Sequence, residues 1–536
     1  MFAKCFFYFP ASIFTFIFFT VNAQVNLVQL SNVPFPGQRV AGVWHYTDSL
    51  NHEYALVGTE NGLSIVDVTD PFSPLFILQV PGISNKWHEI KTWSHYAYVT
   101  TEGTDTLGIQ DGLQIIDLRY LPDSAPAHYW QGDGSIAGRL HRAHTLTVAN
   151  GFVYINGHNI FSLHSGVIIA DLIDPWNPHF VGADTSNYCH DSFVRGDTLW
   201  ASEIWAGQFA VYNISNRSAP VLNATEHTPA QFNHNAWLSD NSRVLFTTDE
   251  RNHAKLASFD VTDLSNIELL GTYAVTHVVD SGNWDAVHNV RVLNDFLINA
   301  CYGSQITLVD AAYPDNLVEV GNFPIPATLA WDADPFLPSG NILATGLTAG
   351  LYVLSPTYVR ACYLEGNVTD SVTGSFLNNV TVQILSTTAF STSNASGEYK
   401  TGYVSSGNYT IKFSKTGYYS KIISAVTLSN GVITVVDAQL AQDYSAIVEQ
   451  DEASAGCIFP NPFSESTQLI IAERFFNDNS PLRILIKDVT GRVVKKITGF
   501  KSSPVKISKD KLGNGLYFYE IRNDSGLIGQ GKMIVQ

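Results

Sequence analysis

Cysteine is scarce in this chain, which has five among 536 residues. Cys5 lies near the N-terminus, just ahead of an apolar stretch. The other four are too few and too scattered for a disulfide scaffold or a CxxC zinc site; they are Cys189, Cys301, Cys362 and Cys457. We expect free thiols, with one incidental disulfide as the alternative.

Basic residues are also few, since 30 Lys and Arg stand against 48 Asp and Glu and leave a net charge of -18. A chain this acidic is a poor partner for nucleic acid or for an anionic membrane surface. The charge is unevenly distributed, because residues 24–360 carry -20 whereas residues 455–536 carry +5. All 16 histidines lie between His45 and His288. Residues 24–360 are therefore chemically different from the rest of the chain.

Long apolar runs are missing beyond the N-terminus. There, Lys4 precedes an apolar stretch over 6–21, and small residues follow up to Ala23. This order is typical of a secretory signal peptide, which we place at residues 1–23. A membrane anchor is the alternative, but the stretch is short and contains Pro10. No later run is long enough to span a bilayer, so we expect no transmembrane segment in the mature chain.

The sequence shows no helical periodicity, and its low charge with 12% aromatic residues disfavours disorder and coiled coils. Instead, a short strand that ends in Asp and leads into a turn recurs along the chain. Its copies lie at 62–67, 112–117, 166–171, 209–213, 256–260, 306–310 and 350–355. Successive copies end 42 to 54 residues apart, and four strands fit into each repeat. This period predicts a β-propeller, with the Asp bonding amides of the following turn.

Seven copies predict a seven-bladed β-propeller over residues 24–360, with six or eight blades as alternatives. Residues 25–34 resemble an outermost strand such as 317–324, yet they precede the first repeat. The seventh repeat lacks such a strand. We therefore expect the N-terminal strand to complete the last blade and close the ring, which removes exposed sheet edges.

These recurring strands, with Asp-Pro turns at 70–71 and 174–175, resemble LVIVD-repeat β-propellers of the choice-of-anchor B group. Two copies depart from the pattern, with Asn213 and Ser355 in place of the Asp. The resemblance implies an exported propeller whose means of cell attachment varies among members. It implies no reaction.

Residues 361–441 have a different pattern, in which strands of alternating polarity are separated by Gly and Asn turns. This pattern predicts a small β-sandwich. Its segments at 366–370, 380–384, 396–399, 407–411 and 415–418 resemble the carboxypeptidase-regulatory-like module. The resemblance implies a spacer or weak binding module without catalytic residues. Residues 442–455 are polar and acidic, and we interpret them as a linker.

Residues 456–536 form a second predicted β-sandwich and resemble the C-terminal sorting domain of the type IX secretion system. The matching residues are Pro460, Asn461, Pro462, Gly491, Gly515, Tyr517, Gly531 and Lys532. The resemblance implies a source in the Bacteroidota, handling by the type IX machinery and passage across the outer membrane. It also implies removal of this domain, then release or attachment to the cell surface. An ordinary β-sandwich without a targeting role is the alternative.

A histidine opens the first strand of five predicted blades: His88, His144, His190, His234 and His288. Arg39 or a neighbour takes this position in the first blade, and Asp332 or Asp334 in the last. First strands line the channel of a propeller, so these residues are expected around one mouth. The ends of second strands return to the same face and bring Glu60, Glu102, His158, Glu250 and Tyr302.

Three interpretations of this ring remain open. The histidines bond a neighbouring blade, or they bind a ligand or a divalent metal such as Ca²⁺ or Zn²⁺, or they form a catalytic centre. The sequence has no HExxH or GxSxG signature. We therefore favour a non-catalytic binding or adhesion protein, secreted or displayed on the cell surface, with a glycan or protein as ligand. A metal-assisted, lactonase-like hydrolase is the alternative.

Overall fold

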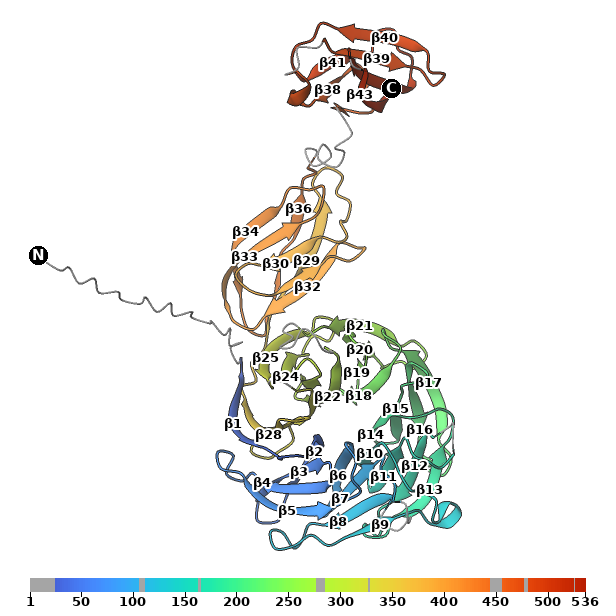
Figure 1. Ribbon diagram of the computed structural model, residues 1–536, viewed down its shortest axis with the longest axis vertical. Helices are drawn as coiled ribbons and strands as arrows, with labels where there is room; N and C mark the ends of the chain where they lie inside the picture. Colours follow the sequence, from blue (N-terminus) through green and yellow to red (C-terminus); the bar gives the residue numbers. More distant parts are fainter. Residues whose placement is uncertain are drawn as a thin grey trace, which may run out of the picture.

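The computed structural model describes residues 25–105, 111–161, 165–275, 285–325, 328–443, 456–476, 481–524 and 526–536. Figure 1 shows a ring of sheets followed along the chain by two smaller β domains. The all-β class and the propeller are confirmed. The predicted signal peptide at 1–23 lies outside the described residues, as do residues 444–455 of the predicted linker.

The described residues between Leu27 and Pro356 form seven four-stranded antiparallel sheets, which we number as blades 1 to 7 in chain order. Blade 1 contains β2 (Val40–Thr47), β3 (Glu53–Thr59), β4 (Gly62–Asp67) and β5 (Leu75–Pro81). Blade 2 contains β6 (His88–Trp93), β7 (Tyr96–Thr101), β8 (Leu113–Asp117) and β9 (Ala127–Trp130). Blade 3 contains β10 (Thr145–Ala149), β11 (Phe152–Asn156), β12 (Val167–Asp171) and β13 (His179–Asp184), and the short 3-10 helix η1 (Gly134–Ile136) precedes it.

Blade 4 contains β14 (Asp191–Arg195), β15 (Thr198–Glu203), β16 (Gln208–Asn213) and β17 (Val221–His227). Blade 5 contains β18 (Asn233–Leu238), β19 (Val244–Asp249), β20 (Leu256–Asp260) and β21 (Glu268–Tyr273). Blade 6 contains β22 (Val287–Leu293), β23 (Phe296–Cys301), β24 (Gln305–Asp310) and β25 (Val318–Pro324). Blade 7 contains β26 (Ala330–Asp334), β27 (Ile342–Gly346), β28 (Gly350–Pro356) and, from the N-terminus, β1 (Leu27–Val33).

The first strand of each blade packs against the first strand of the next, and β26 packs against β2. The ring is therefore closed, with the first strands of the blades around its channel (Figure 1). The middle strands are buried on both sides by neighbouring blades; β3, β7, β23 and β27 are buried along their whole length. This two-sided burial is the reason why these strands read as continuous apolar runs.

The repeated Asp has the role that the sequence predicts. In six blades the side chain at the end of the third strand accepts a hydrogen bond from the amide two residues later, at 2.9–3.2 Å. The acceptors are Asp67, Asp117, Asp171, Asn213, Asp260 and Asp310. Asn213 keeps this bond because an amide oxygen accepts as a carboxylate oxygen does.

The N-terminal strand closes the last blade, as predicted. β1 pairs antiparallel with β28 from Leu27 opposite Pro356 to Val33 opposite Leu351. It also reaches both neighbouring blades, because the Ser31 hydroxyl donates to the Pro71 carbonyl of blade 1 at 2.7 Å. On the other side, the Asn26 side chain donates to the Val320 carbonyl of blade 6 at 2.7 Å. Chain ends that are far apart in sequence thus share one sheet.

The second domain is a sandwich of two sheets around a core of its own. One sheet contains β29 (Cys362–Asp370), β32 (Glu398–Tyr403), β35 (Ile433–Val435) and β36 (Ala438–Leu440). The other contains β30 (Thr381–Ile384), β31 (Phe390–Thr392), β33 (Gly407–Ser414) and β34 (Lys421–Leu428).

The propeller is joined to this sandwich by a bonded junction at the end of blade 6. The fully buried Asp310 accepts hydrogen bonds from the Arg360 guanidinium at 2.6 Å and from the Ala361 amide at 2.7 Å. Asn316 of the next turn donates to Glu365 at 2.9 Å and to the Thr401 carbonyl at 3.1 Å. The repeated Asp of blade 6 therefore also positions the following domain.

We expect Asp310→Ala to lower the free energy of unfolding by about 2–4 kcal/mol, because it leaves the buried Ala361 amide without its acceptor and removes the ion pair with Arg360. Asp260→Ala is the matched control. Asp260 has the same place in blade 5, but among the described residues its side chain bonds Thr262 of its own turn and no other, so about 1 kcal/mol is expected. Differential scanning calorimetry of the two variants measures this. Equal losses would show that the junction adds nothing to stability.

The third domain is also a two-sheet sandwich with its own core. Its smaller sheet contains β37 (Gly456–Phe459), β38 (Ser466–Ile471) and β41 (Val505–Ser508). Its larger sheet contains β39 (Arg483–Lys487), β40 (Val493–Thr498), β42 (Gly515–Asn523) and β43 (Gly526–Val535); the 3-10 helix η3 spans Glu473–Phe475. In the described part of the chain, no helix has the length and apolarity to cross a membrane. The four described cysteines are free thiols, as expected.

Candidate ligand and metal site at the propeller mouth

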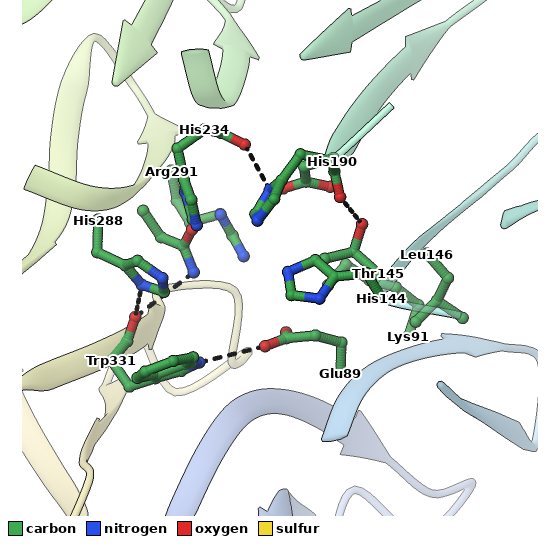
Figure 2. A pocket seen from close by; sticks show the side chains of 12 residues that line it. Glu89, Lys91, His144, Thr145, Leu146, His190, His234, His288, Arg291 and Trp331 are labelled. Carbon is green, nitrogen blue, oxygen red and sulfur yellow. Dashed lines mark hydrogen bonds between the residues drawn. The ribbon is translucent and has the colours of Figure 1, made fainter. Parts of the chain in front are cut away.

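Five aromatic rings from consecutive blades follow one another around one mouth of the channel, each tilted against the next. The ring centroids are 4.2 Å apart from His144 to His190, from His190 to His234 and from His234 to His288. Trp331 of blade 7 follows His288 at 4.6 Å. Figure 2 shows these rings facing a common centre. We call His144, His190, His234, His288 and Trp331 the mouth ring.

Local irregularities of the strands explain how these residues face the channel. His234, His288 and Trp331 each lie at a β-bulge, where two residues of the first strand face one of the second. A bulge turns its extra residue out of the regular ladder. His144 and His190 lie just before their strands, and their amides bond the second strand of their own blade.

His88 does not join the mouth ring, which corrects the sequence prediction. It pairs regularly with Thr101, without a bulge, and its side chain packs toward blade 1. Two glycines of that blade make the space, since a Cβ at Gly58 would lie 2.9 Å from the His88 Cβ and one at Gly82 would lie 3.5 Å from its Nε2. Burial lowers the pKa of His88 to about 4, against a smaller opposite effect of the Ile83 backbone.

Blades 1 and 7 also differ from the prediction. The ring position of blade 7 is taken by Trp331, not by Asp332 or Asp334, which lie deeper in the channel. In blade 1 the equivalent residue is Ala41, because its carbonyl accepts from Thr345 as the His288 carbonyl accepts from Thr248. Arg39 instead forms an exposed ion pair with Glu60 at 3.0 Å. The ring is therefore incomplete on the side of blades 1 and 2.

Most of the imidazoles are held through one ring nitrogen. His190 Nδ1 lies 3.1 Å from the His234 carbonyl of the next blade, and His288 Nδ1 lies 2.6 Å from the Trp331 carbonyl. His144 Nδ1 lies 2.8 Å from a carboxylate oxygen of Glu102. Since a carbonyl oxygen carries no proton, Nδ1 is the donor in His190 and His288, and the Nε2 of each of these two rings keeps a free lone pair. The Nδ1 atoms of His190 and His288 therefore bond the neighbouring blade, as in the first of the three interpretations. Their Nε2 atoms remain available for a ligand.

The charge state of the ring follows from burial and from Glu102. Burial lowers the pKa of His190 and of His234 well below the usual 6.5, and lowers that of His288 to about 3. These three rings are therefore neutral near pH 7. For His144, burial also lowers the pKa, but the bond and charge of Glu102 outweigh it and the pKa is raised.

The other predicted rim residues divide into two groups. Glu102 and Glu250 reach the ring: Glu102 bonds His144, and a carboxylate oxygen of Glu250 lies within 4.8 Å of ligand atoms of His190 and His234. His158 does not line the cavity behind the ring. It is buried in blade 3, where its Nδ1 accepts from the Ile160 amide at 3.2 Å, and burial lowers its pKa to about 4.

Behind the mouth ring lies a cavity of about 20 Å³, room for about one water-sized group. Its floor is charged, because Lys91, Arg291, Glu89 and Asp191 are among the residues that line it. Figure 2 shows Lys91, Arg291 and Glu89 beside the rings. Burial and the nearby Asp332 raise the pKa of Glu89 to about 7. The lining residues are Glu89, Lys91, His144, Thr145, Leu146, His190, Asp191, His234, His288, Asn289, Arg291 and Trp331.

The sequence prediction missed this charged floor. Lys91 and Arg291 each lie three residues after the repeated histidine of their blade, where Phe193 and Trp237 stand in blades 4 and 5. The sequence did contain a signal for the charged floor, because Lys91 and Arg291 occupy a position of the innermost strand that is aromatic in blades 4 and 5. In blades 4 and 5 this position holds aromatic side chains that pack together, with the Phe193 and Trp237 rings 4.8 Å apart.

An aromatic patch borders the mouth beside blades 4 and 5. The Trp205 ring lies 6.3 Å from Tyr188 and 5.4 Å from Phe232. Trp205 is 72% exposed although it is large and apolar. The Phe232 carbonyl accepts from the Glu250 amide at 3.2 Å, which places the patch next to the rim carboxylate. We call Tyr188, Trp205 and Phe232 the mouth patch.

The predicted sorting residues meet at the C-terminal strand of the third domain. Asn461 accepts from the Ile534 amide at 2.7 Å and donates to the Lys532 carbonyl at 3.1 Å. Pro460 and Pro462 flank this asparagine, so the Pro-Asn-Pro segment is bonded to β43. Residues that lie about 70 positions apart in sequence are thereby joined.

The glycines of the same motif have separate roles. Gly531 lies opposite Tyr519, where a Cβ would come within 2.5 Å of the tyrosine hydroxyl. Gly491 has a φ of +86° in the turn between β39 and β40, and Gly515 begins β42. Tyr517 donates to the Gly513 carbonyl at 3.0 Å. Gly491, Gly531 and Lys532 line a groove of about 700 Å³.

Comparison with known proteins gives three family matches. The LVIVD repeat matches residues 49–81, the carboxypeptidase regulatory-like domain matches residues 363–441, and the secretion system C-terminal sorting domain matches residues 457–536. Among solved structures, the β-propeller domain of Cps50 (Swd1) from Myceliophteria thermophila is similar at 12% identity and a TM-score of 0.43. That match covers 61% of this chain and 98% of the other. No curated protein matches the chain.

The fold and the family matches agree on the organisation of the molecule. The chain is a secreted propeller protein of the cell surface or the extracellular space, with a regulatory-like sandwich and a sorting domain that the type IX secretion machinery handles.

Proposed function

We propose that this protein is a binding or adhesion protein and that its ligand is a surface glycan bound at the propeller mouth. The exposed Trp205 of the mouth patch is the observation that carries this proposal. An aromatic face offers apolar contact to the C–H side of a sugar, and nearby polar groups bond its hydroxyls. Glu102 and Glu250 supply acceptors at the same mouth, beside the neutral imidazoles.

Trp205→Ala should weaken glycan binding at least tenfold, about 1.4 kcal/mol, because an exposed tryptophan at the centre of a contact carries much of its energy. The wild-type chain is applied to an array of bacterial capsular and cell-surface polysaccharides, and affinities are then measured by calorimetry. Phe72→Ala is the control, since Phe72 is equally exposed at 72% but lies in the turn of blade 1 that follows the third strand. Wild-type binding by Trp205→Ala, or no polysaccharide bound by the wild type, would contradict the proposal.

The mouth also has a feature that favours a second function, a metal-assisted hydrolase. Two imidazoles and a carboxylate are the ligands of many catalytic zinc ions, which activate a bound water. The described residues leave only about 20 Å³ behind the ring, too little for a substrate beside an ion. We therefore place binding first. Zinc-dependent turnover of small lactones by the purified chain would reverse this order.

A further inference from the structure

Three metal-ligating side chains from neighbouring blades meet at the mouth. His190 precedes β14 of blade 4, His234 lies in β18 of blade 5, and Glu250 follows β19 of the same blade. One ligand atom of each lies within 4.8 Å of the others. A tetrahedral zinc ion holds its ligand atoms about 3.4 Å apart, so small side-chain rotations suffice. We infer that His190, His234 and Glu250 bind one zinc ion.

The surroundings of His190 have the arrangement typical of zinc ligands. A ligating histidine usually donates its other ring nitrogen to a carbonyl or carboxylate, which fixes the tautomer and the ring orientation. His190 Nδ1 has such a bond to the His234 carbonyl at 3.1 Å, so its Nε2 lone pair is the ligand atom. This bond exists before any metal arrives, and the ring needs no rearrangement of its tautomer.

His234 offers a nitrogen that the fold does not use. Its Nδ1 is buried and, among the residues that the structure describes, has no hydrogen-bond partner of ordinary geometry. The His288 backbone lies beside this nitrogen, at a geometry that falls short of an ordinary hydrogen bond. A buried polar atom without a hydrogen-bond partner destabilises the fold. A metal ion bound to Nδ1 of His234 would remove this cost directly. A metal ion bound to Nε2 would leave Nδ1 protonated, so that it could donate a hydrogen bond.

Glu250 is held toward the same point. Its Oε1 accepts a hydrogen bond from the Tyr302 hydroxyl of blade 6 at 2.8 Å, a contact of the kind that orients ligating carboxylates. Blades 4, 5 and 6 therefore all contribute to the site. Two imidazole nitrogens with one carboxylate favour zinc over calcium, which prefers six to eight oxygen ligands. Three protein ligands leave one position for water or for an oxygen of a bound molecule.

The test is calorimetric titration of the purified, chelator-treated chain with zinc chloride, followed by elemental analysis. We expect one zinc ion per chain. Glu250→Gln should weaken zinc binding at least tenfold while keeping an acceptor for Tyr302. Glu102→Gln is the matched control, because Glu102 bonds His144 at the same mouth but is not one of the three ligands; its affinity for zinc should equal that of the wild type.

A second variant covers the case in which one substitution disturbs folding. His234→Asn removes a ring whose Nδ1 makes no ordinary bond, and circular dichroism verifies its fold. Zinc affinity unchanged in both Glu250→Gln and His234→Asn would overturn the inference, as would absence of zinc binding or preferential binding of calcium chloride. The zinc site shares Glu250 with the proposed glycan site, but the two proposals are tested separately. Trp205→Ala should bind zinc as the wild type does, so either proposal can fail alone.

Discussion

We expect Leu27→Ala to lower the free energy of unfolding by about 3–5 kcal/mol, the largest loss for any single apolar residue discussed. Leu27 is fully buried at the start of β1, in a cluster with Val320, Phe323 and Leu354 of blades 6 and 7. Truncation of the Leu27 side chain leaves a cavity at the place where the N-terminal strand closes the ring. Since β1 covers the outer edge of β28, weaker anchoring of β1 also exposes that sheet edge.

Val28→Ala is the matched control for this prediction, because Val28 is the next residue of the same strand and is 53% exposed. We expect a loss below about 0.5 kcal/mol, as for other surface substitutions. Urea denaturation followed by circular dichroism compares the two variants. Deletion of residues 25–33 should have a stronger effect, an open propeller that aggregates through β28. A monomeric deletion variant as stable as the wild type would show that β1 does not close the ring.

The sequence predicted those features that depend on local chemistry. The Asp at the end of each third strand bonds an amide two residues away, so its role is contained in a few consecutive residues. The closure by residues 25–34 was also predictable. These residues have the pattern of an outermost strand, and the last repeat is the one that lacks such a strand. Both predictions use the period of the repeat and require no knowledge of distances between blades.

The composition of the mouth ring could not be predicted in the same way. His88 and His288 occupy equivalent sequence positions, yet only His288 lies at a bulge and faces the channel. Whether a bulge forms depends on pairing with the second strand and on space beside it, such as that left by Gly58. Trp331 was missed for the same reason. It takes the place of a histidine in the mouth ring, although the sequence of blade 7 has no histidine at this position.

We expect Asp332→Asn to lower the free energy of unfolding by about 3 kcal/mol, through the loss of the negative charge that compensates a buried cation. Asp332 is 1% exposed and accepts from the Arg291 guanidinium at 3.1 Å and from Asn289 at 3.0 Å. Arg291 is itself only 4% exposed. Removal of one partner of a buried ion pair leaves a poorly compensated charge shielded from solvent, which typically costs 3–5 kcal/mol. Asp191 compensates part of it, so the lower end is expected.

The double variant Arg291→Met with Asp332→Asn decides whether the charge is the reason. Removal of both charges takes away the desolvation cost together with the attraction, so its stability should return to within about 1 kcal/mol of the wild type. Glu60→Gln is the control, because the exposed Arg39–Glu60 pair should contribute less than about 1 kcal/mol. Urea denaturation of the three variants supplies the comparison. If the double variant is as unstable as Asp332→Asn, the unpaired charge of Arg291 is not the cause of the loss. Asp332 then stabilises the channel through its bonds to Asn289 and to the backbone.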